Sequence, residues 1–144
     1  MTYFRYFIPE IVEESRALYL DCDMIVHKSL DKLFEISFDG NYILAVRDSW
    51  DVNSFNAGMM VVNVDKWVSE NICQQLLDLT HEKHQEVYGD QGVLNLLFKD
   101  KWKELTPYFD FMVGLDAEIF YEKKTDMHDI CIISSFYNNL WSYC

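Results

Sequence analysis

Short, mostly apolar runs alternate along this chain with segments in which apolar residues recur at the spacing of a helix. The helical segments are 4–12, 68–77 and 93–98, and the strand-like runs are 17–20, 42–46, 59–64 and 130–133. Strands that alternate with helices predict an α/β domain with a parallel or mixed sheet. A continuous apolar run such as 17–20 is typical of a strand that is buried on both faces.

Polar residues and helix breakers set the expected ends of the helices. Pro9 stands inside the first apolar pattern, so we expect that helix to start late or to kink there. Asn63 or Asp65 is available to cap one long helix that runs to about His84. A break at Gly89 then precedes the next helix.

The size and composition of the chain fit one folded domain. It has 144 residues, of which 50% are hydrophobic, with five Gly and two Pro. This composition excludes disorder and low-complexity repeats, and the length suffices for one core, so we expect a single domain over 1–144. The net charge of −12 argues against nucleic acid as the main partner, because phosphate binding there relies on Lys and Arg. A phosphate ligand held through a divalent cation remains compatible with an acidic protein.

The cysteines and the N-terminal sequence bear on location. The four Cys show no Cys-x-x-Cys spacing, and together with the four His they complete no zinc signature. Scattered, reduced cysteines favour a cytoplasmic protein. We expect neither a signal peptide nor a transmembrane segment, because no apolar stretch approaches the roughly 20 residues that a membrane span requires.

Asp21 and Asp23 form the first candidate site. They stand where the apolar run 17–20 ends, and open α/β sheets bind ligands at the ends of their strands. Two carboxylates that point the same way from an extended segment can hold one divalent cation and, through it, a diphosphate. In so acidic a chain an Asp-x-Asp pair also arises by chance, so a solvated turn or a cap for the next helix is the alternative.

Three other segments contain candidate ligand contacts, each with a structural alternative. Asn56 offers a donor and an acceptor beside small residues that let a ligand approach, although an ordinary turn before a strand is the simpler explanation of this stretch alone. Asp90 and Gln91 can orient a sugar or an Arg at the start of a helix, while Asp90 can also simply cap that helix. Arg5 can pair with phosphate or with Asp90, or can only cover apolar surface with its stem.

Four segments are more specific when their order and spacing are taken together than when each is taken alone. They are YFRYFIPE at 3–10, ALYLDCDMIV at 17–26, FNAGMMVVN at 55–63 and YGDQGVLN at 88–95. Together, over about 3–111, they resemble the central portion of glycosyltransferase family 8, which includes bacterial lipopolysaccharide galactosyl- and glucosyltransferases and glycogenin. The resemblance implies a GT-A-like mixed sheet flanked by helices, with Mn²⁺ or Mg²⁺ as the cofactor. It implies retaining hexosyl transfer from a UDP-sugar, UDP-galactose or UDP-glucose, to a saccharide acceptor such as a lipopolysaccharide core.

The resemblance assigns the metal and nucleotide contacts to one tripeptide. Asp21 and Asp23 are the implied metal ligands, and Asp21 also bridges the metal and the donor ribose. Cys22 takes the variable middle position, where the backbone contacts the nucleotide. In the family, the metal ion acts as a Lewis acid toward the departing diphosphate.

The same resemblance assigns the sugar contacts. Arg5 is implied to contact the donor sugar or phosphate and to pair with Asp90, while Asn56 and Ala57 line the donor-sugar pocket. Asp90 holds sugar hydroxyls, and Gln91 lies at the β-face of the anomeric carbon, so these two are the implied catalytic residues. A polar amide there stabilises an oxocarbenium-like centre by its dipole. Front-face attack and a covalent intermediate both remain open.

Two segments of the family pattern have no counterpart here. The nucleotide-binding first half has no place before Tyr3, and a later His-x-x-Gly-x-x-Lys-Pro-Trp segment, which supplies a third metal ligand, is not matched at 134–141. We therefore expect an incomplete domain, a fragment or degenerate copy with weak or no transferase activity alone. Any peripheral association with a membrane is expected to come through the missing parts.

Two functions of other classes stay open. A haloacid dehalogenase-type phosphatase also ends an apolar strand in Asp-x-Asp, with Asp21 as nucleophile and Asp23 as general acid. The later Lys and acidic pair that such an enzyme needs cannot be placed in this sequence. The second alternative is a non-catalytic acidic domain that binds a metal ion or a nucleotide. Phosphate release from p-nitrophenyl phosphate favours the first, and titration with Mn²⁺ and UDP distinguishes the second.

Overall fold

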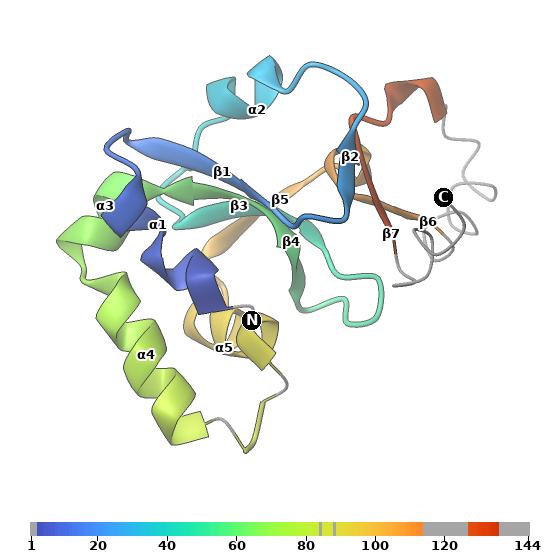
Figure 1. The fold of residues 1–144 in the computed structure, drawn as a ribbon. Coiled ribbons are helices and arrows are strands. Elements are labelled where there is room, and N and C mark those ends of the chain that lie inside the picture. The colour runs from blue at the N-terminus through green and yellow to red at the C-terminus, as the bar shows by residue number, and fades with distance from the viewer. Residues whose placement is uncertain (1–2, 84, 88, 114–126, 136–144) are drawn as a thin grey trace.

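The computed structural model describes residues 3–83, 85–87, 89–113 and 127–135. Figure 1 shows two β-sheets, with most of the helices gathered on one side of the larger sheet. The strands are β1 (Arg16–Leu20), β2 (Met24–Val26), β3 (Ile43–Arg47), β4 (Phe55–Asn63), β5 (Trp102–Leu105), β6 (Phe111–Val113) and β7 (Ile132–Ser135). The α-helices are α1 (Ile8–Ile11), α2 (Asp31–Glu35), α3 (Val64–Ser69), α4 (Ile72–Lys83) and α5 (Gly89–Leu97). The 3-10 helices are η1 (Tyr3–Phe7), η2 (Pro107–Phe109) and η3 (Met127–Asp129).

The larger sheet is mixed in direction. Its order is β1-β4-β3-β5, with β4 antiparallel to both neighbours and β3 parallel to β5. The smaller sheet has the order β2-β7-β6, in which β7 is antiparallel to β2 and parallel to β6. The α/β architecture expected from the sequence, a mixed sheet flanked by helices, is confirmed.

The larger sheet has an apolar core on each face. Side chains along β3 alternate between the two cores, as the pleat of a strand requires. The first core lies under η1, α1, α3, α4 and α5, and its largest buried residues include Tyr6, Phe55, Trp67, Leu76, Leu94 and Phe98. The second core lies under α2 on the opposite face, and it includes Leu33, Leu44, Met59, Val61 and Ile132.

Strand β4 changes the face to which its side chains point. Phe55 and Ala57 belong to the first core, whereas Met59, two residues beyond Ala57, belongs to the second. The register between β3 and β4 shifts in the same stretch, between Ala45 and Arg47. An irregularity of this kind bends a strand and re-aims its side chains, and such features are common next to binding sites.

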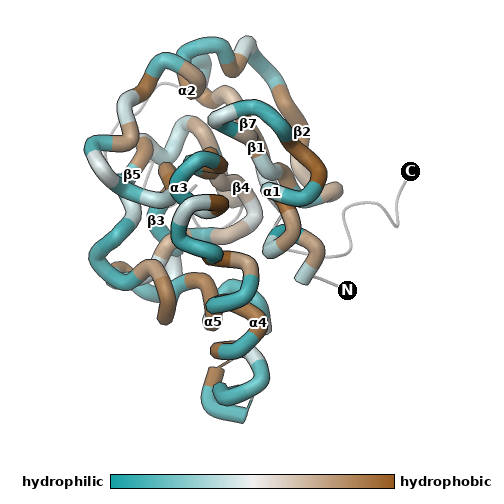
Figure 2. The backbone as a smooth tube through the Cα atoms, turned by 90° about the vertical axis from the view of Figure 1, so that its left-hand side faces the viewer, coloured by the Kyte–Doolittle hydropathy of each residue, from teal (hydrophilic) through white to brown (hydrophobic). Residues whose placement is uncertain are grey.

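The long helix expected after β4 is divided into two. α3 ends at Ser69 and α4 begins at Ile72, because Asn71 adopts a left-handed conformation with φ of 52°. Asn tolerates this conformation better than most residues and can end a helix. The expected cap at Asn63 is confirmed, since its side chain accepts the Lys66 N–H. Figure 2 shows hydrophilic and hydrophobic residues mixed along α4, as expected for a helix with one buried side.

Three expectations about strands are wrong, and one about the first helix is confirmed. β1 is only half-buried, with Ala17 its one buried residue, because it is the outermost strand of the described sheet. β4 begins at Phe55, so the small residues at 56–58 belong to a strand and not to a turn. β5 and β6 occupy stretches for which no strand was expected. Near Pro9 the 3-10 helix η1 gives way to the short α1, which fits the expected late start.

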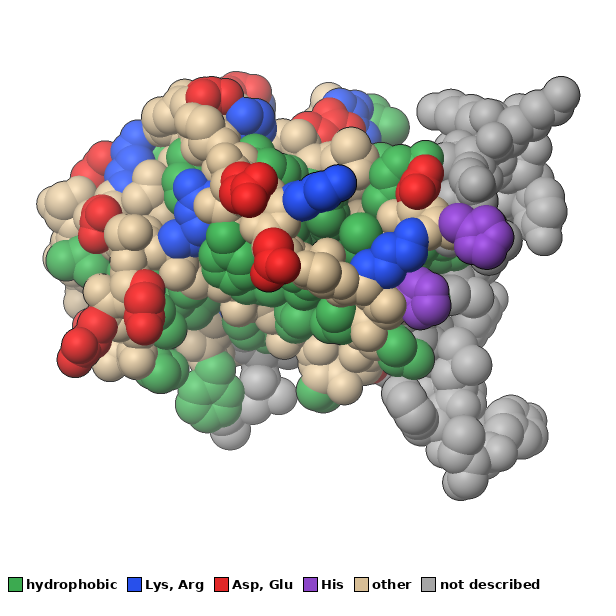
Figure 3. Space-filling model, turned by 90° about the horizontal axis from the view of Figure 1, so that it is seen from above, with side chains coloured by type: hydrophobic (Ala, Val, Ile, Leu, Met, Phe, Trp, Pro, Cys, Tyr) green, Lys and Arg blue, Asp and Glu red, His purple; other side chains and the backbone are tan. Residues whose placement is uncertain are grey.

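The surface of the described part carries charges of both signs. In the view of Figure 3, acidic and basic side chains are scattered among hydrophobic ones. Some basic side chains have structural partners: Arg16 on β1 donates to three backbone carbonyls around the end of α2, those of Leu33, Phe34 and Ile36. No helix among the described residues is long and apolar enough to cross a membrane.

Candidate active site

The segment that follows β1 is tied to the irregular part of β4. The Asp21 N–H donates to the Gly58 carbonyl at 2.8 Å, and the Asp21 carbonyl accepts the Met24 N–H at 3.4 Å in a turn that leads into β2. Asp21 and Asp23 both line one cleft at this turn. Cys22, which stands between them, is exposed and lines neither of the two clefts described below.

Arg5 is buried between two carboxylates. Its side chain is 5% exposed, with Nη2 at 3.0 Å from Asp21 Oδ1 and Nε at 2.7 Å from Asp90 Oδ2. The contact with Asp90 lacks the alignment of a hydrogen bond, so charge attraction carries it. Nη1 donates to the Ala57 carbonyl, and the guanidinium lies 4.6 Å from the centre of the Tyr19 ring. The expected pairing of Arg5 with Asp90 is confirmed, and its contact with Asp21 is an additional finding.

Two tyrosine hydroxyls lie near this ion pair network. Tyr19 Oη donates to Asp21 Oδ1 at 2.6 Å, and burial together with this hydrogen bond raises the pKa of Tyr19 above its ordinary value. Burial also raises the pKa of Tyr6 to about 12, although a hydrogen bond from Thr80 opposes that shift. Both hydroxyls therefore stay protonated at neutral pH, and Tyr19 remains available to donate to the carboxylate of Asp21.

The first two turns of α5 bind the start of β4 through two amide side chains. Gln91 Oε1 accepts the Ala57 N–H at 3.0 Å, and Gln91 Nε2 donates to Asp48 Oδ2 at 2.7 Å. Asn95 Oδ1 accepts the Phe55 N–H at 2.8 Å, and Asn95 Nδ2 donates to the Phe55 carbonyl at 2.9 Å. β1 pairs with residues 59–63 of β4 and does not extend to Phe55 and Ala57. The hydrogen bonds from Gln91 and Asn95 occupy the backbone groups that a neighbouring strand would otherwise pair.

Gly58 keeps the centre of the site open. A methyl group at this position would lie 2.7 Å from Met24 Cε, 3.1 Å from Asn56 Oδ1 and 3.2 Å from Asp21 Oδ2. Asn56 Oδ1 accepts the Gly58 N–H at 2.8 Å, and Asn56 Nδ2 lies 3.2 Å from Met112 Sδ. Any side chain at position 58 would therefore collide with groups that line the cleft.

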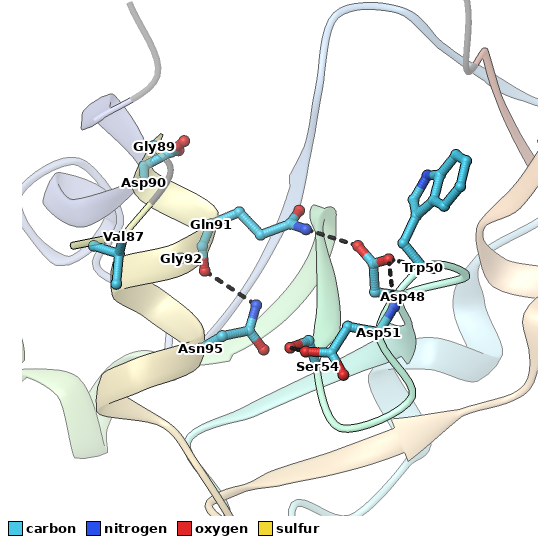
Figure 4. Close-up of a pocket in the computed structure, with 10 residues that line it drawn as sticks. All are labelled: Asp48, Trp50, Asp51, Ser54, Val87, Gly89, Asp90, Gln91, Gly92 and Asn95. Atoms are coloured by element: carbon cyan, nitrogen blue, oxygen red, sulfur yellow. Dashed lines mark hydrogen bonds between the residues drawn. The ribbon is translucent and has the colours of Figure 1, made fainter. Parts of the chain in front are cut away.

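Two clefts adjoin at this site. The first, which we call the Asp21 cleft, has a volume of about 260 Å³ and is lined by Asp21, Asp23, Met24, Asp48, Trp50, Asn56, Gly58, Gln91, Met112 and Ser134. The second, the α5 cleft, has a volume of about 770 Å³ and is lined by Asp48, Trp50, Asp51, Ser54, Val87, Gly89, Asp90, Gln91, Gly92 and Asn95. Figure 4 shows the α5 cleft between the start of α5 and the loop that follows β3. Asp48, Trp50 and Gln91 line both clefts and so stand between them.

The structure brings most of the site residues expected from the sequence together. Those that line one or both clefts are Asp21, Asp23, Asn56, Asp90 and Gln91. Arg5 and Ala57 line neither cleft, because both are buried behind the cleft walls, Arg5 as an ion partner and Ala57 through its backbone groups. The roles of these residues in binding and catalysis remain predictions.

Four residues of the Asp21 cleft were missed by the sequence analysis. Asp48 follows β3 as Asp21 follows β1, so a carboxylate at the end of a strand was the available signal. Trp50 is 68% exposed in the loop after β3, where no periodic pattern marks it. Met112 on β6 and Ser134 on β7 belong to the smaller sheet, in which β7 pairs with both β2 and β6 and so brings the two residues beside the Asp-x-Asp turn.

Asp21 and Asp23 are suitable ligands for part of a metal site. Carboxylate oxygens are the donors that Mn²⁺ and Mg²⁺ prefer, and such ions keep further positions for phosphate oxygens and water. In the part of the chain that the structure describes, no group of three His, Cys, Asp or Glu side chains is placed to hold a metal ion. The segment in which the family pattern supplies a third ligand falls mostly at 136–141, outside the described residues. The described residues therefore fit a cation whose coordination is completed by a diphosphate and water.

Comparison with known sequences gives the class of the protein. The family model for Glycosyl transferase family 8 matches residues 1–134, and the chain belongs to this family. Glycosyltransferase GlyB of Streptococcus pneumoniae serotype 4 (strain ATCC BAA-334 / TIGR4) is 54% identical over 132 residues, which are 90% of this chain and 33% of GlyB. The chain thus spans about a third of the length of this curated relative.

Solved structures agree with this class. The crystal structure of the glycosyltransferase GlyE from Streptococcus pneumoniae TIGR4 matches with a TM-score of 0.82 and 39% identity, over 96% of this chain and 38% of that one. The galactosyltransferase LgtC, in complex with donor and acceptor sugar analogues, shares the fold with a TM-score of 0.79 at 24% identity, over 95% of this chain and 58% of LgtC. The fold is therefore GT-A-like, and the phosphatase alternative has no support.

Proposed function

We propose that this chain carries the metal and donor-sugar contacts of a retaining hexosyltransferase. The enzyme would move a hexosyl group from UDP-galactose or UDP-glucose to a saccharide acceptor. One observation carries the proposal: Asp21 and Asp23, from the turn between β1 and β2, line a single cleft together with Gln91 from α5. Membership of glycosyltransferase family 8 supplies the reaction class.

Asp21 and Asp23 are the proposed ligands of Mn²⁺ or Mg²⁺. A metal ion bound there would offset the negative charge of the departing UDP. Asp21 Oδ1 is already engaged by Arg5 and Tyr19, whereas Asp21 Oδ2 lies toward Gly58 and the cleft. Asp21 Oδ1 is thus bonded within the protein, while Oδ2 faces the cleft. Arg5 compensates the charge of this partly buried carboxylate.

Gln91 and Asp90 are the proposed contacts to the reacting sugar. The amide dipole of Gln91 suits an anomeric carbon that gains positive charge as the glycosidic bond to UDP breaks. Gln91 Oε1 accepts one backbone hydrogen bond, and an amide oxygen has a second lone pair for another partner. Arg5 holds Asp90 at the first turn of α5, where its carboxylate can accept hydrogen bonds from sugar hydroxyls.

The end of the α5 cleft at Trp50, away from Asp90, is the proposed acceptor side (Figure 4). The indole of Trp50 is exposed where the two clefts meet, close to the carboxylate of Asp48 (Figure 4). A saccharide presents C–H faces and hydroxyls together, so an exposed aromatic ring beside polar groups is a suitable surface for it. A lipopolysaccharide core is one acceptor of this kind.

A cytoplasmic location is part of the proposal. Cys22, Cys73 and Cys131 are free thiols, which is the usual state of cysteines in a reducing compartment. Peripheral association with a membrane, through parts of the longer relatives that this chain lacks, belongs to the same proposal. Because the chain spans about a third of GlyB, transferase activity of this chain alone is itself a proposal.

Calorimetric titration of the full chain with Mn²⁺, in the presence and absence of UDP, tests the proposal. We expect Mn²⁺ to bind when UDP is present, and D21N and D23N each to weaken this binding by more than the roughly 10–100-fold that the loss of an outer-shell partner costs. D39N is the matched control, because Asp39 is an exposed carboxylate that pairs with Lys103 away from both clefts. An absence of binding heat in every titration would contradict the proposal and favour an inert acidic domain.

An assay of UDP-hexose hydrolysis and transfer with Mn²⁺ separates binding from catalysis. We expect weak or no turnover from this chain alone. Binding without turnover fits both an incomplete transferase domain and the alternative of a non-catalytic domain that binds metal and nucleotide. Turnover close to that of the longer relatives would contradict the expected weak activity.

A further inference from the structure

Asp48 is a buried carboxylate that connects two separate segments of the site. Its side chain lies at the end of β3, and the residue is 8% exposed. Asp48 Oδ1 accepts the N–H groups of Trp50, at 2.7 Å, and of Asp51, at 3.3 Å. Asp48 Oδ2 accepts Gln91 Nε2 at 2.7 Å (Figure 4). A buried charge needs such hydrogen bonds, and here each oxygen serves a different element.

The Gln91 amide is held at both ends. Its oxygen accepts the Ala57 N–H, and its nitrogen donates to the Asp48 carboxylate. Rotation of the amide by half a turn would set its NH₂ group against the Ala57 N–H and its oxygen against the carboxylate. Both hydrogen bonds would then be lost, and the bond to a charged acceptor is the stronger of the two. Asp48 therefore decides which end of the amide faces β4.

We propose that Asp48 is a positioning residue for Gln91, which it fixes in the one amide orientation that the sugar-transfer site uses. This inference rests on the proposed function, in which Gln91 faces the anomeric carbon of the donor. Asp48 affects sugar transfer by holding Gln91 in place, and the two residues line both clefts where these adjoin. Preorganised dipoles need no reorientation during the reaction, which is why the orientation of this amide matters for rate.

The loop after β3 has enough hydrogen bonds of its own to stand without Asp48 Oδ2. The Asp48 N–H donates to the Ser54 carbonyl, and the Ser54 N–H donates to the Asp51 carbonyl, both at 2.9 Å. The Asp51 side chain accepts the Asn53 N–H at 3.0 Å and the Ser54 hydroxyl at 2.6 Å. Asp48 Oδ2 therefore contributes to the position of Gln91 and not to the closure of the loop.

The variant D48N separates these two contributions. Asn has the shape of Asp and retains one oxygen for the N–H groups of Trp50 and Asp51, so the loop keeps its support. The other position becomes an NH₂ group that faces Gln91 Nε2, where two donors cannot bond.

The side-chain amide resonance of Gln91 in ¹⁵N NMR spectra of the full chain is the first measurement. It is assigned by its absence from Q91E. We expect D48N to shift this resonance toward the value of a solvated Gln and to speed its hydrogen exchange roughly tenfold. The Asn95 amide, which donates to the Phe55 and Gln91 carbonyls, should keep its position and shows that α5 is intact. An unchanged Gln91 resonance in D48N would overturn the proposal.

D51N is the matched control for this measurement. It makes the same substitution in the same loop, but the Asp51 side chain contacts Asn53 and Ser54 and not Gln91. We expect the Gln91 resonance to stay in place in D51N. A shift equal to that in D48N would mean that the loop as a whole, and not Asp48, holds the amide.

The affinity for the sugar part of the donor is the second measurement. With Mn²⁺ present, we expect D48N to weaken UDP-glucose or UDP-galactose binding about tenfold relative to UDP. Equal losses for UDP and for the UDP-hexose in D48N would contradict positioning of a sugar-side group. If the unmodified chain binds neither ligand, the proposed function fails, while the amide resonance still decides whether Asp48 orients Gln91.

Discussion

Arg5 Nε lies 2.7 Å from Asp90 Oδ2, and this ion pair joins the 3-10 helix η1 to the first turn of α5. The same guanidinium contacts Asp21, at the end of β1. Arg5 therefore compensates one carboxylate on the proposed metal side and one on the proposed sugar side. Because Arg5 and Asp90 are both nearly buried, the loss of either partner leaves a charge that water cannot solvate.

The variant R5M removes the charge of Arg5 and keeps most of the volume of its stem. Two carboxylates then share a buried region without a cation, and we expect the free energy of unfolding to fall by about 3–5 kcal/mol. Urea unfolding at neutral pH, followed by circular dichroism, measures this change. R47M is the control, since Arg47 and Glu104 are each 46% exposed and their pair is worth no more than about 1 kcal/mol. Similar losses in the two variants would contradict the special position of Arg5.

The variant G58A tests whether the centre of the site must stay open. The added methyl group would lie 2.7 Å from Met24 Cε, which can move, and 3.2 Å from Asp21 Oδ2, which is tied to Arg5 and Tyr19. We expect a loss of about 1–3 kcal/mol in stability and a fall of roughly tenfold or more in Mn²⁺ affinity in the presence of UDP. Thermal unfolding and calorimetric titration give the two numbers.

G40A is the control for G58A. A methyl group on Gly40 meets no atom within 4 Å, but its φ of 84° strains any residue other than Gly. We therefore expect G40A to lose about 1–2 kcal/mol of stability through its backbone and to bind Mn²⁺ with UDP as the unmodified chain does. Weaker Mn²⁺ binding in G40A would show that stability alone explains the effect of G58A.

The sequence predicts the parts of this site that lie at the ends of apolar runs. The turn at Asp21 follows β1, and the helix at Gln91 starts at a glycine, so hydrophobic period and breakers locate both. The face change in β4 was not predictable in the same way, because the apolar run that starts at 59 predicts a strand that begins there. Asp48 was missed for a different reason: its importance comes from the Gln91 side chain, which tertiary packing brings to it.

Tertiary contacts also determine strand pairings that local sequence patterns do not predict. β5 is a short strand whose partner is β3, and the parallel pairing of the two depends on a connection through β4, α3, α4 and α5. The smaller sheet joins β2 to strands from the other end of the described chain. Neither pairing leaves a signal in a short window of sequence.

The conformation of Asn71 allows a test of the break between α3 and α4. In a continuous helix, N71A would stabilise the protein by up to about 0.7 kcal/mol, because Ala has the higher helix propensity. With φ at 52°, the Ala side chain instead clashes with the backbone, and we expect a loss of about 1–2 kcal/mol. N71G should be neutral or slightly stabilising, since Gly adopts this conformation without strain. Urea unfolding gives the sign of each change, and a stabilising N71A would contradict the break.

The buried hydroxyl of Tyr6 makes stability depend on pH in the alkaline range. Burial raises the pKa of Tyr6 from 10.0 to about 12, so between these values the unfolded chain releases a proton that the folded chain keeps. Stability from this group is complete below pH 10 and falls as the pH rises toward 12, with a total loss of about 2–3 kcal/mol.

The variant Y6F isolates this contribution. It removes the titrating group, and Thr80 keeps its hydrogen bond to the Leu76 carbonyl, so the packing around position 6 changes little. By pH 11 the unmodified chain should have lost about 1.4 kcal/mol more than Y6F, relative to their stabilities near pH 8.5. Urea unfolding of both proteins over this range, with α-helical circular dichroism as the signal, makes the comparison. Parallel curves for the two proteins would mean that the Tyr6 hydroxyl titrates alike in the folded and unfolded chains, because every other alkaline group is common to both.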